Sequence, residues 1–420
     1  MPIKMSKKAD SAKSNRHQSS NLDNGTGIAT AWAECKLGDL VEITHGYAFK
    51  GEFFSDVPTD DILLTPGNFK IGGGFKADKF KYYKGDYPSE YILHPHDIVV
   101  TMTDLSKEAD TLGYSAIVPE IKGKKLLHNQ RIGRVKLKSD LADIGFINWI
   151  MRTAEYRWHI IGSASGSTVS HTSPTRILGY QFMLPPLLEQ RAVSAVLSIL
   201  EDKINILHCQ NKTLEGLAST LWRKTFVENP DANWEETGLD KIAHFLNGLP
   251  CQKYPPKGAS ALPVIKIKEL RVGITEDSDL AASDVPVEYL VEAGDILFSW
   301  SGSLDVVIWG HAQGVLNQHL FKVTSQEYPK WFCYFWIKHH LPEFQDIAQD
   351  KATTMGHIQR HHLSDAKVLI PDTKIFDELN MQFLPLFEKY IHNLKVIRRL
   401  ASLRDALLPK LMSGEVRVTL

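Results

Sequence analysis

The sequence has few of the features that a metal-binding, secreted or membrane protein needs. Its 420 residues include only 4 cysteines, and Cys35, Cys209, Cys251 and Cys333 form neither a CxxC pair nor the spacing of a zinc site. An apolar run of about 18 residues, the length needed to span a membrane, is also missing. We therefore expect reduced thiols, no metal ion and a cytoplasmic location.

Motifs of common enzyme classes are missing as well. There is no GxGxxG after a predicted strand, no HExxH and no GxSxG, and the stretch Gly72-Gly73-Gly74-Phe75-Lys76 lacks the spacing and the hydroxyl of a phosphate loop. Neither Pro185-Pro186 nor Pro255-Pro256 precedes an aromatic residue, so the adenine-binding signature of amino-methyltransferases is absent. The chain is expected to bind rather than to catalyse, and to carry no cofactor of its own.

Neither sign of charge dominates the composition. The 48 basic and 49 acidic residues leave a net charge of −1, with 43% hydrophobic residues, which is typical of a globular protein long enough for two domains. A whole-protein basic surface is excluded, so any nucleic-acid footprint must be local or shared with a partner. Residues 1–30 are rich in Lys, Ser, Asn, Asp and Gly, and are expected to form a flexible tail.

What the sequence does contain is the same pattern twice, about 186 residues apart. The three clearest echoes pair residues 166–171 with 352–357, 94–101 with 291–299, and 128–131 with 316–319. A repeat of this length far exceeds the period of a solenoid, so it predicts two similar domains. Two similar domains indicate one task performed at two places.

The local patterns predict a mixed architecture in each half. Short runs rich in Val, Ile, Phe and Tyr predict strands near residues 61–65, 97–103, 116–118 and 132–137. Aromatic-rich helices are predicted at 146–159 and 331–344. The fold class is therefore α+β, with a largely antiparallel sheet in each domain rather than a regular βαβ winding.

Each half ends in a proline followed by a long amphipathic helix, predicted at 187–226 and 372–412. Apolar residues recur every seven positions, which is typical of coiled coils. The seam residues are Val193, Leu200, Leu207, Asn211, Leu214 and Leu221 in the first helix, and Leu386, Asn393, Leu400 and Leu407 in the second. The pattern predicts that the helices pack on each other, antiparallel about a pseudo-twofold axis.

This symmetry pairs Asn211 with Asn393 when Leu207 meets Ile397. We hypothesise that the two asparagines meet in the apolar seam and fix its register, whereas the alternative is that each faces solvent. Pro385 predicts that the second helix bends or begins late, because proline removes a helical hydrogen bond. Asp372 is the expected N-cap.

Basic and aromatic residues gather in two stretches of each half, at 75–87 and 122–138 and at 266–271 and 351–362. Long cationic side chains neutralise phosphates, and Asn, Gln, Ser and Thr can contact base edges in a groove. A solvated charged face is the alternative interpretation. The repetition of Thr168 with His171, and of Thr354 with His357, favours a shared DNA-binding surface.

The end of the chain carries a recognisable pattern. Residues 404–416 resemble the C-terminal signature of the specificity subunits of type I restriction-modification systems, and the stretches 166–171, 184–191, 295–299 and 316–319 also resemble that family. The resemblance covers about residues 32–418 and implies two target recognition domains, each reading one half of a split DNA site. The implied parts are a tail at 1–30, recognition domains at 31–185 and 233–371, a central spacer helix at 186–232 and a C-terminal spacer helix at 372–420.

The resemblance also implies partners. Two methylation subunits that carry S-adenosylmethionine would dock on the spacer helices, and restriction subunits that use ATP and magnesium would join them. The chain would direct adenine methylation or restriction without a reaction of its own. A helix of about 40 residues spans about 60 Å, against about 34 Å for one turn of B-DNA, so the rod is long enough to hold two readers.

Candidate DNA-contacting residues come from the repeated stretches. In the first domain they are Thr101, Thr103, Asn129, Gln130, Arg131, Ser167, Thr168 and His171; in the second they are Ser299, Ser301, Asn317, Gln318, His319, Lys351, Thr353, Thr354 and His357. Asn129 and Asn317 have the alternative role of bracing the backbone. Two other functions stay open: a self-contained methyltransferase or nuclease with two recognition domains, and a duplicated scaffold that binds proteins.

Overall fold

The computed structural model describes residues 32–104, 106, 109–166, 169–256, 260–275, 277–350 and 356–418, so the N-terminal tail lies outside it. The described chain divides into two compact units. The first holds residues up to Ile71, Phe75–Ile144 and His159–Gln190, and the second holds Gly72–Gly74, Gly145–Trp158 and the chain from Arg191 onward. Of the described helices, none combines the length and the apolar character needed to cross a membrane.

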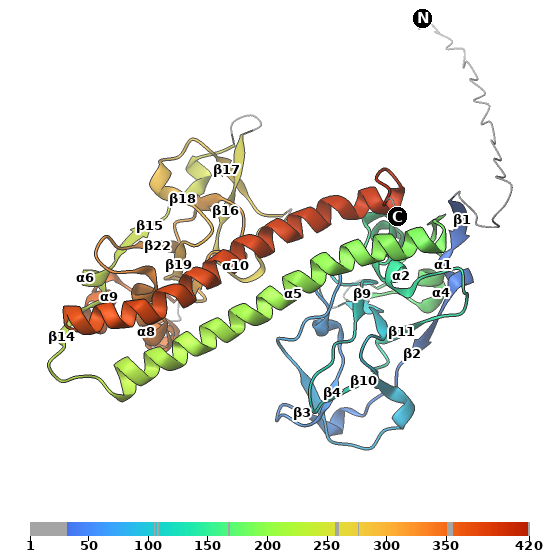
Figure 1. Cartoon of the computed structure of the whole chain (residues 1–420), viewed down its shortest axis with the longest axis horizontal. Coiled ribbons are helices and arrows are strands. Elements are labelled where there is room, and N and C mark those ends of the chain that lie inside the picture. Colours follow the sequence, from blue (N-terminus) through green and yellow to red (C-terminus); the bar gives the residue numbers. More distant parts are fainter. Residues whose placement is uncertain are drawn as a thin grey trace, which may run out of the picture. The chain divides into compact units, whose positions relative to one another are not determined.

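The first half of the chain contains the strands β1 to β13 and the helices α1 to α4 (Figure 1). The strands are β1 Ala33–Lys36, β2 Val41–His45, β3 Phe54–Ser55, β4 Asp61–Leu63, β5 Lys81–Tyr83, β6 Ile92–Leu93, β7 Ile98–Thr101, β8 Thr103–Asp104, β9 Ser115–Ile117, β10 Lys125–Leu127, β11 Ile132–Leu137, β12 Ser170–His171 and β13 Gln181–Leu184. The helices are α1 Leu37–Leu40, α2 Ile144–Ile150, α3 Ala154–Ser163 and α4 Pro174–Leu178.

These strands form two main sheets. One has the order β2-β11-β7-β9 and is antiparallel throughout; the other has the order β3-β5-β4-β10-β6, in which only β4 and β10 run parallel. Alternate residues of the central strands, such as Val99, Ala116 and Ile132, form the apolar core between them. The strand that opens this half, β1, pairs with the strand that closes it, β13.

The rest of the chain contains the long helix α5, which ends the first half, and then the strands β14 to β23 and the helices α6 to α10. The strands are β14 Glu235–Gly238, β15 His244–Asn247, β16 Ala261–Ile265, β17 Leu280–Ala282, β18 Leu290–Val291, β19 Ile296–Ser299, β20 Val306–Ile308, β21 Gly314–Leu316, β22 Leu320–Thr324 and β23 Lys367–Ile370. The helices are α5 Leu187–Arg223, α6 Leu239–Ile242, α7 Ile267–Val272, α8 Lys330–Asp350, α9 Arg360–Asp365 and α10 Thr373–Ser413.

The strand order of the second half repeats that of the first. The sheet β15-β22-β19-β20 corresponds to β2-β11-β7-β9, and the sheet β17-β16-β21-β18 again contains a single parallel pair, β16 with β21. The outer strands β14 and β23 pair as β1 and β13 do. The predicted α+β class and the internal repeat are therefore confirmed, with largely antiparallel sheets.

Two predicted elements are each divided in the structure. The strand predicted at 97–103 is β7 followed by β8, and the helix predicted at 146–159 is α2 followed by α3. The second division has a local cause: the Thr153 hydroxyl donates to the Ile150 carbonyl at 2.9 Å and accepts from the Tyr156 amide at 3.3 Å. Thr153 thereby ends one helix and starts the next, as Ser and Thr side chains do at caps.

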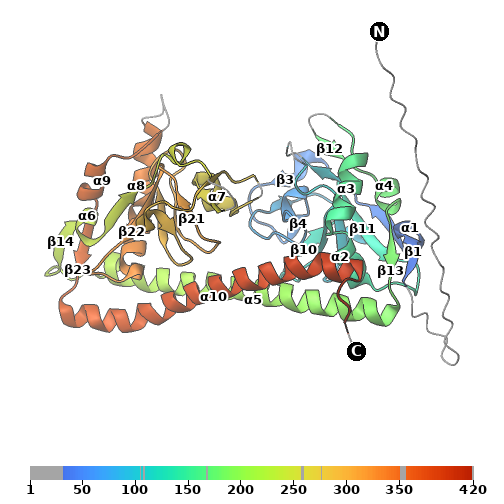
Figure 2. The ribbon, with the colours of Figure 1, turned by 90° about the horizontal axis from the view of Figure 1, so that it is seen from above.

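The helices α5 and α10 run side by side in opposite directions (Figures 1 and 2). The first has 37 residues and ends in a π-helical turn at Lys224–Glu228, and the second has 41 residues. Asp372 is the N-cap of α10, as predicted, because its carboxylate accepts from the Ile375 amide at 3.1 Å. The prediction that the second helix begins late, at Pro385, is therefore wrong, because α10 begins upstream at Thr373. A bend at Pro385 stays a prediction.

The two asparagines meet in the seam, as hypothesised. The Asn393 amide donates to Asn211 Oδ1 at 2.8 Å and to Gln210 Oε1 at 2.9 Å, and the Asn211 amide donates to the Tyr390 carbonyl at 3.2 Å. Leu207 packs with Ile397 in the same seam. Of the predicted seam residues, Val193, Leu207, Asn211 and Asn393 are buried, and Leu200, Leu214, Leu221, Leu386, Leu400 and Leu407 are half-buried.

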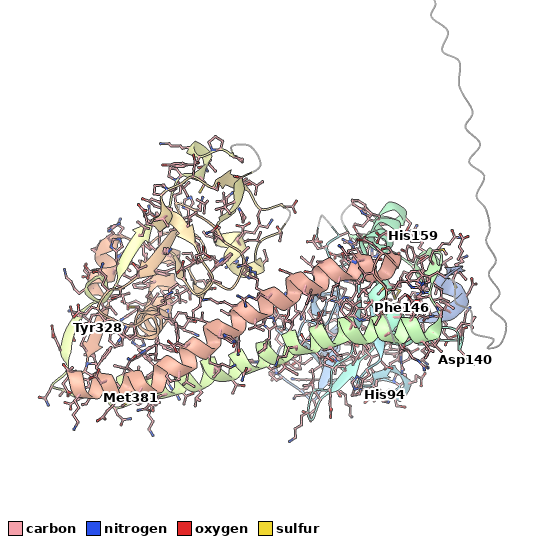
Figure 3. All side chains as sticks on the ribbon, turned by 45° about the horizontal axis from the view of Figure 1, so that its top comes forward. His94, Asp140, Phe146, His159, Tyr328 and Met381 are labelled. Atoms are coloured by element: carbon pink, nitrogen blue, oxygen red, sulfur yellow. The ribbon has the colours of Figure 1, made fainter. Side chains whose placement is uncertain are left out.

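One large core joins the sheet of the second half to both long helices through α8. The rings of Trp331 and Phe383 stack at 4.3 Å, and Trp222 and Phe226 of the α5 end contact the same aromatic group. Near the other end of the paired helices, α2 lies beside them (Figures 1 and 2). Its Phe146, labelled in Figure 3, is fully buried.

Candidate nucleic-acid interface

A glycine turn in each half packs against an asparagine turn. A Cβ on Gly46 would lie 2.3 Å from the Asn129 carbonyl oxygen, and a Cβ on Gly248 would lie 2.2 Å from that of Asn317. The close approach lets Tyr47 form a parallel bridge with Asn129, and Leu249 form one with Asn317. Because only glycine fits this approach, the two halves share one backbone framework.

The hydrogen bonds of this framework also repeat. The Tyr47 amide donates to the His128 carbonyl at 2.8 Å and the Gln130 amide to the Tyr47 carbonyl at 2.9 Å. In the second half the Leu249 amide donates to the Leu316 carbonyl at 2.9 Å, and the Gln318 amide to the Leu249 carbonyl at 2.9 Å. The side chains of Asn129 and Asn317 are buried, which favours the bracing role for both.

In the first half, two hydroxyl residues at the end of β7 lead to the candidate histidine. The fully buried Thr101 donates its hydroxyl to the Thr103 carbonyl at 2.9 Å. Thr103 is paired with His171 between β8 and β12, and its hydroxyl lies 3.2 Å from His171 Nδ1. His171 is exposed and is held in place by a buried threonine.

The second half builds an equivalent arrangement with an added tryptophan. Ser299 is fully buried and donates to the Ser303 carbonyl at 2.9 Å. The Ser301 hydroxyl lies 3.0 Å from His319 Nδ1, and Ser301 also forms a bridge with His357. Between the two histidines stands Trp300, with ring centroids 6.1 Å from His319 and 6.3 Å from His357.

Exposure separates the candidates into two groups. Thr101, Thr103, Asn129, Ser299, Ser301 and Asn317 are buried and bonded within the protein. Gln130, Arg131 and His171 are exposed, and Gln318, His319 and His357 are half-buried. Ser167, Thr168, Lys351, Thr353 and Thr354 lie outside the described residues. The first group supports the loops, and the second group offers polar side chains to a ligand.

Exposed lysines are frequent in the two basic stretches of the first half, residues 75–87 and 122–138. Several of them have no acidic partner within the described part of the chain: Lys79, Lys84, Lys122, Lys125, Lys136 and Lys138. Lys124 instead pairs with Asp60 at 3.0 Å, and Arg134 with Asp97 at 2.9 Å. In the second half Lys266 pairs with Asp279, and Arg271 bonds to Ser303. Lys268 and Arg360 of the second half are exposed and have no acidic partner among the described residues, so cationic side chains available to phosphates occur in both halves.

Two titratable groups beside the first framework have shifted pKa values. Burial lowers the pKa of His128 to about 4, although its Nε2 donates to the Ile132 carbonyl at 2.9 Å. Burial alone would raise the pKa of Asp104, but hydrogen bonds from Thr111 and Ser106 outweigh it and lower that pKa. Asp104 is therefore an anion bonded within its own loop, and His128 is neutral at pH 7.

The sequence reasoning missed three residues that shape this region. Trp300 contributes the aromatic face described above. Asn68 is fully buried, and its amide donates to the Lys79 carbonyl at 2.9 Å and to the Lys76 carbonyl at 3.3 Å, so it organises the lysine-bearing segment. Arg152 is a buried cation of α2's C-terminal turn. Only Asn68 carried a local signal, a Thr65–Asn68 capping pair around a proline.

The described residues were compared for side chains that could bind a metal ion together. No group of three or more His, Cys, Asp or Glu side chains there is close enough to hold an ion. All four cysteines are free, with Cys251 and Cys333 buried. The rings of neighbouring histidines contact each other: those of His361 and His362 have centroids 4.0 Å apart and are tilted by 50°.

Comparisons with known proteins agree with this architecture. The family model of the type I restriction modification DNA specificity domain matches residues 30–216. The specificity subunit of type I restriction enzyme MjaIX from Methanocaldococcus jannaschii is 25% identical over 308 residues, 65% of this chain and 69% of that protein. The EcoBI specificity subunit of Escherichia coli is 20% identical over 441 residues, 94% of this chain and 88% of that protein.

A solved structure has the same fold. The crystal structure of the S subunit of a type I restriction-modification system from M. genitalium aligns with a TM-score of 0.54 at 14% identity, covering 93% of this chain and 98% of that one. The sequence matches extend over both halves, and the duplicated strand order accounts for the two-part pattern. Residues 30–216 therefore match the type I restriction modification DNA specificity domain, and over most of its length the chain is similar to the specificity subunits of type I restriction enzymes.

Proposed function

We propose that each half of this specificity subunit reads one half of a bipartite DNA site. The observation that carries the proposal is a framework built twice that presents corresponding polar side chains, with Arg131 in the first half where His319 stands in the second. The exposed or half-buried set is Gln130, Arg131 and His171 in the first half, and Gln318, His319 and His357 in the second. A shared backbone that exchanges Arg131 for His319, and Met102 for Trp300, suits two readers of different base sequences.

The chemistry of these side chains suits base edges. Arginine pairs with guanine and glutamine with adenine in the major groove. The exposed lysines of the first half would contact phosphates. The first reader would comprise residues 31–185 and the second residues 233–371. The segments 186–232 and 372–420 would form the rod that carries them.

The rod would also dock the partner subunits. Ile199, Ile206 and Leu217 are 66%, 61% and 55% exposed. Their spacing places all three on one face of α5, and on α10 Met381, labelled in Figure 3, is 71% exposed. Such an apolar stripe suits a protein partner. In this proposal two methylation subunits that carry S-adenosylmethionine bind here, and restriction subunits supply the ATP- and magnesium-dependent reaction.

The two other functions that the sequence left open receive less support. All of the curated relatives that match are named specificity subunits. A self-contained methyltransferase or nuclease, and a protein-binding scaffold, would each require a different kind of relative. The chain would direct adenine methylation or restriction that its partners perform.

Domain exchange combined with a genome-wide map of methylated adenines tests the proposal. The chain, co-expressed with its methylation partner, is expected to give one two-part motif. Exchange of residues 31–185 for those of a relative should replace one half of the motif and leave the other half and the spacing unchanged.

The matched control is the exchange of residues 233–371, which should replace only the other half. A motif that both exchanges leave intact would contradict half-site reading. Methylation by the chain alone would favour the self-contained enzyme, and methylation that does not depend on the chain would favour the scaffold.

A further inference from the structure

A buried arginine lies where the α2 segment meets α5. The Arg152 side chain is 5% exposed, its guanidinium lies 4.1 Å from the centre of the Trp149 ring, and its Nη2 lies 3.7 Å from Glu201 of α5. Trp149 itself donates to the Ser198 hydroxyl of α5 at 3.1 Å. A cation this deeply buried is costly unless its partners are fixed, so the site is closely specified.

The second long helix completes the network. Arg404 of α10 forms an ion pair with the same Glu201 carboxylate and bonds to Asp405 at 2.8 Å. The Glu201 side chain is only 13% exposed, and it pairs with two arginines from different elements, Arg152 and Arg404. One carboxylate thus ties the α2 segment, α5 and α10 together within a single compact unit.

The contact with Arg152 explains the run of three glycines at Gly72–Gly74. Arg152 Nε donates to the Gly72 carbonyl at 3.0 Å. Gly72, Gly73 and Gly74 all have positive φ angles, 82°, 88° and 96°, a conformation that favours glycine. A Cβ on Gly73 would lie 2.6 Å from the Arg152 side chain. The loop needs glycine because it lies directly against the arginine.

This loop is the tip of a lysine-bearing segment. Phe69 and Phe75 on either side of the tip form a bridge. Beyond Phe75 the chain continues to Lys76 and Lys79, whose carbonyls accept from the buried Asn68 amide. The tip is thus held by Arg152 and the base by Asn68, and Phe75, Lys76 and Lys79 lie along this segment.

The second half has a weaker counterpart of the Arg152–Glu201 ion pair. Lys338 of α8 stands 186 residues after Arg152 and pairs with Glu215 of α5, and its Nζ lies 5.5 Å from the Tyr334 ring centre. The two side chains are 38% and 34% exposed, so solvent screens the pair. Among the described residues no second cation bonds to Glu215 and no glycine loop bonds to Lys338.

We propose that Arg152 is a positioning residue for the reading of the first half-site, acting through the Gly72–Gly74 loop, while Glu201 and Arg404 hold Arg152 in place. The inference rests on the proposed half-site reading. Loss of the arginine frees the tip of the lysine-bearing segment but leaves the second half untouched. The expected defect is lower discrimination against wrong bases in one half-site only.

The test uses the chain assembled with its methylation partner and duplexes carrying the mapped site. Each duplex has one base pair changed in the first or in the second half, and methylation rates give a discrimination ratio for each half. Arg152→Met should lower the first-half ratio about tenfold, the size of one base-pair preference, and leave the second-half ratio unchanged. Lys338→Met, the matched control, should leave both ratios unchanged.

Gly73→Ala supplies a second variant that keeps every charge. Its methyl group displaces the arginine from the loop, so it should lower the same first-half ratio, and it carries the test if Arg152→Met does not fold. Unchanged ratios in a folded Gly73→Ala complex would overturn the inference. So would an equal fall in both ratios, which a merely structural role would produce. A wild-type complex whose discrimination does not divide into two halves would instead overturn the half-site proposal.

Discussion

Single backbone positions set the framework of each half. Gly46 and Gly248 each lie in a glycine turn that packs against the backbone carbonyl oxygens of the asparagine turn of the same half. Neither position has space for a side chain. The sequence repeat marked this region correctly, because a shared framework requires the same residue types in both halves. The burial of Asn129 and Asn317 fits the proposed function, in which two readers of different bases would share support rather than base contacts.

The glycine turn can be tested with a single methyl group. Gly46→Ala places a Cβ 2.3 Å from two backbone carbonyl oxygens, which cannot rotate away. It should destabilise the first half by about 2 kcal/mol or more, seen as a fall of several degrees in the melting temperature. Gly51→Ala, where nothing lies within 4 Å, is the control. Equal melting temperatures for the two variants would show that the turn tolerates the methyl group.

His128 gives the protein a defined pH dependence. Burial holds the pKa of His128 in the folded state near 4, against 6.5 in the unfolded chain, with Arg134, Asp97 and His45 as the titratable neighbours. Below pH 6.5 the unfolded chain takes up a proton that the folded chain refuses. Stability is therefore fully present above pH 6.5 and falls towards pH 4, by at most about 3 kcal/mol.

The measurement is the melting temperature between pH 7 and pH 4.5. Wild type should lose more stability over this range than His128→Gln, whose amide still donates to the Ile132 carbonyl but does not titrate. Because Asp97 and the other neighbours are common to both proteins, the difference between the curves reports His128. Parallel curves would assign the acid sensitivity to other groups.

At the scale of elements, periodicity predicted best where it was longest. The heptads located α5 and α10 to within a few residues, and the paired asparagines followed from their register. The divided elements were beyond reach, because a threonine hydroxyl bonding to its own backbone decides the break between α2 and α3. The Arg152 network was equally hidden, since it joins residues from three distant segments that share no pattern.

Neighbouring residues of α5 separate packing from docking. Leu207 is 4% exposed in the seam, whereas Ile206 is 61% exposed. Leu207→Asp buries a charge, so it should lower the melting temperature strongly and weaken partner assembly as a consequence. Leu400→Asp, at the half-buried seam position of α10, should act in the same direction.

Ile206→Asp is the matched substitution one position away. It should leave the melting temperature nearly unchanged and weaken the complex with the methylation partner, as measured by co-purification. If Ile206→Asp assembles normally, the exposed stripe is not the docking face. If Leu207→Asp melts like wild type, the seam is not what holds the helices together.

At the scale of the whole molecule, the two halves share a strand order but not their attachments. A buried arginine network ties the α2 segment to the two long helices. In the second half one large aromatic core around α8 joins the sheet to the same helices. The duplication could be predicted because matching residues recur at one offset. The difference in attachment could not, because the residue 186 positions before Arg404 is Ala218, and nothing local distinguishes a helix-facing arginine from a solvated one.

The pairing of α5 with α10 has a consequence for synthesis. About 150 residues separate the end of α5 from the start of α10, and a ribosome needs roughly ten to thirty seconds to add them. Throughout that interval β1 and β13 of the first half have both been made and are free to pair, whereas Arg404 is still missing from the Arg152 network and the seam of α5 has no helix to cover it. The nascent chain therefore carries an uncovered leucine face until its last 50 or so residues emerge, and that is the stage at which a chaperone, or a second nascent copy, has something to bind.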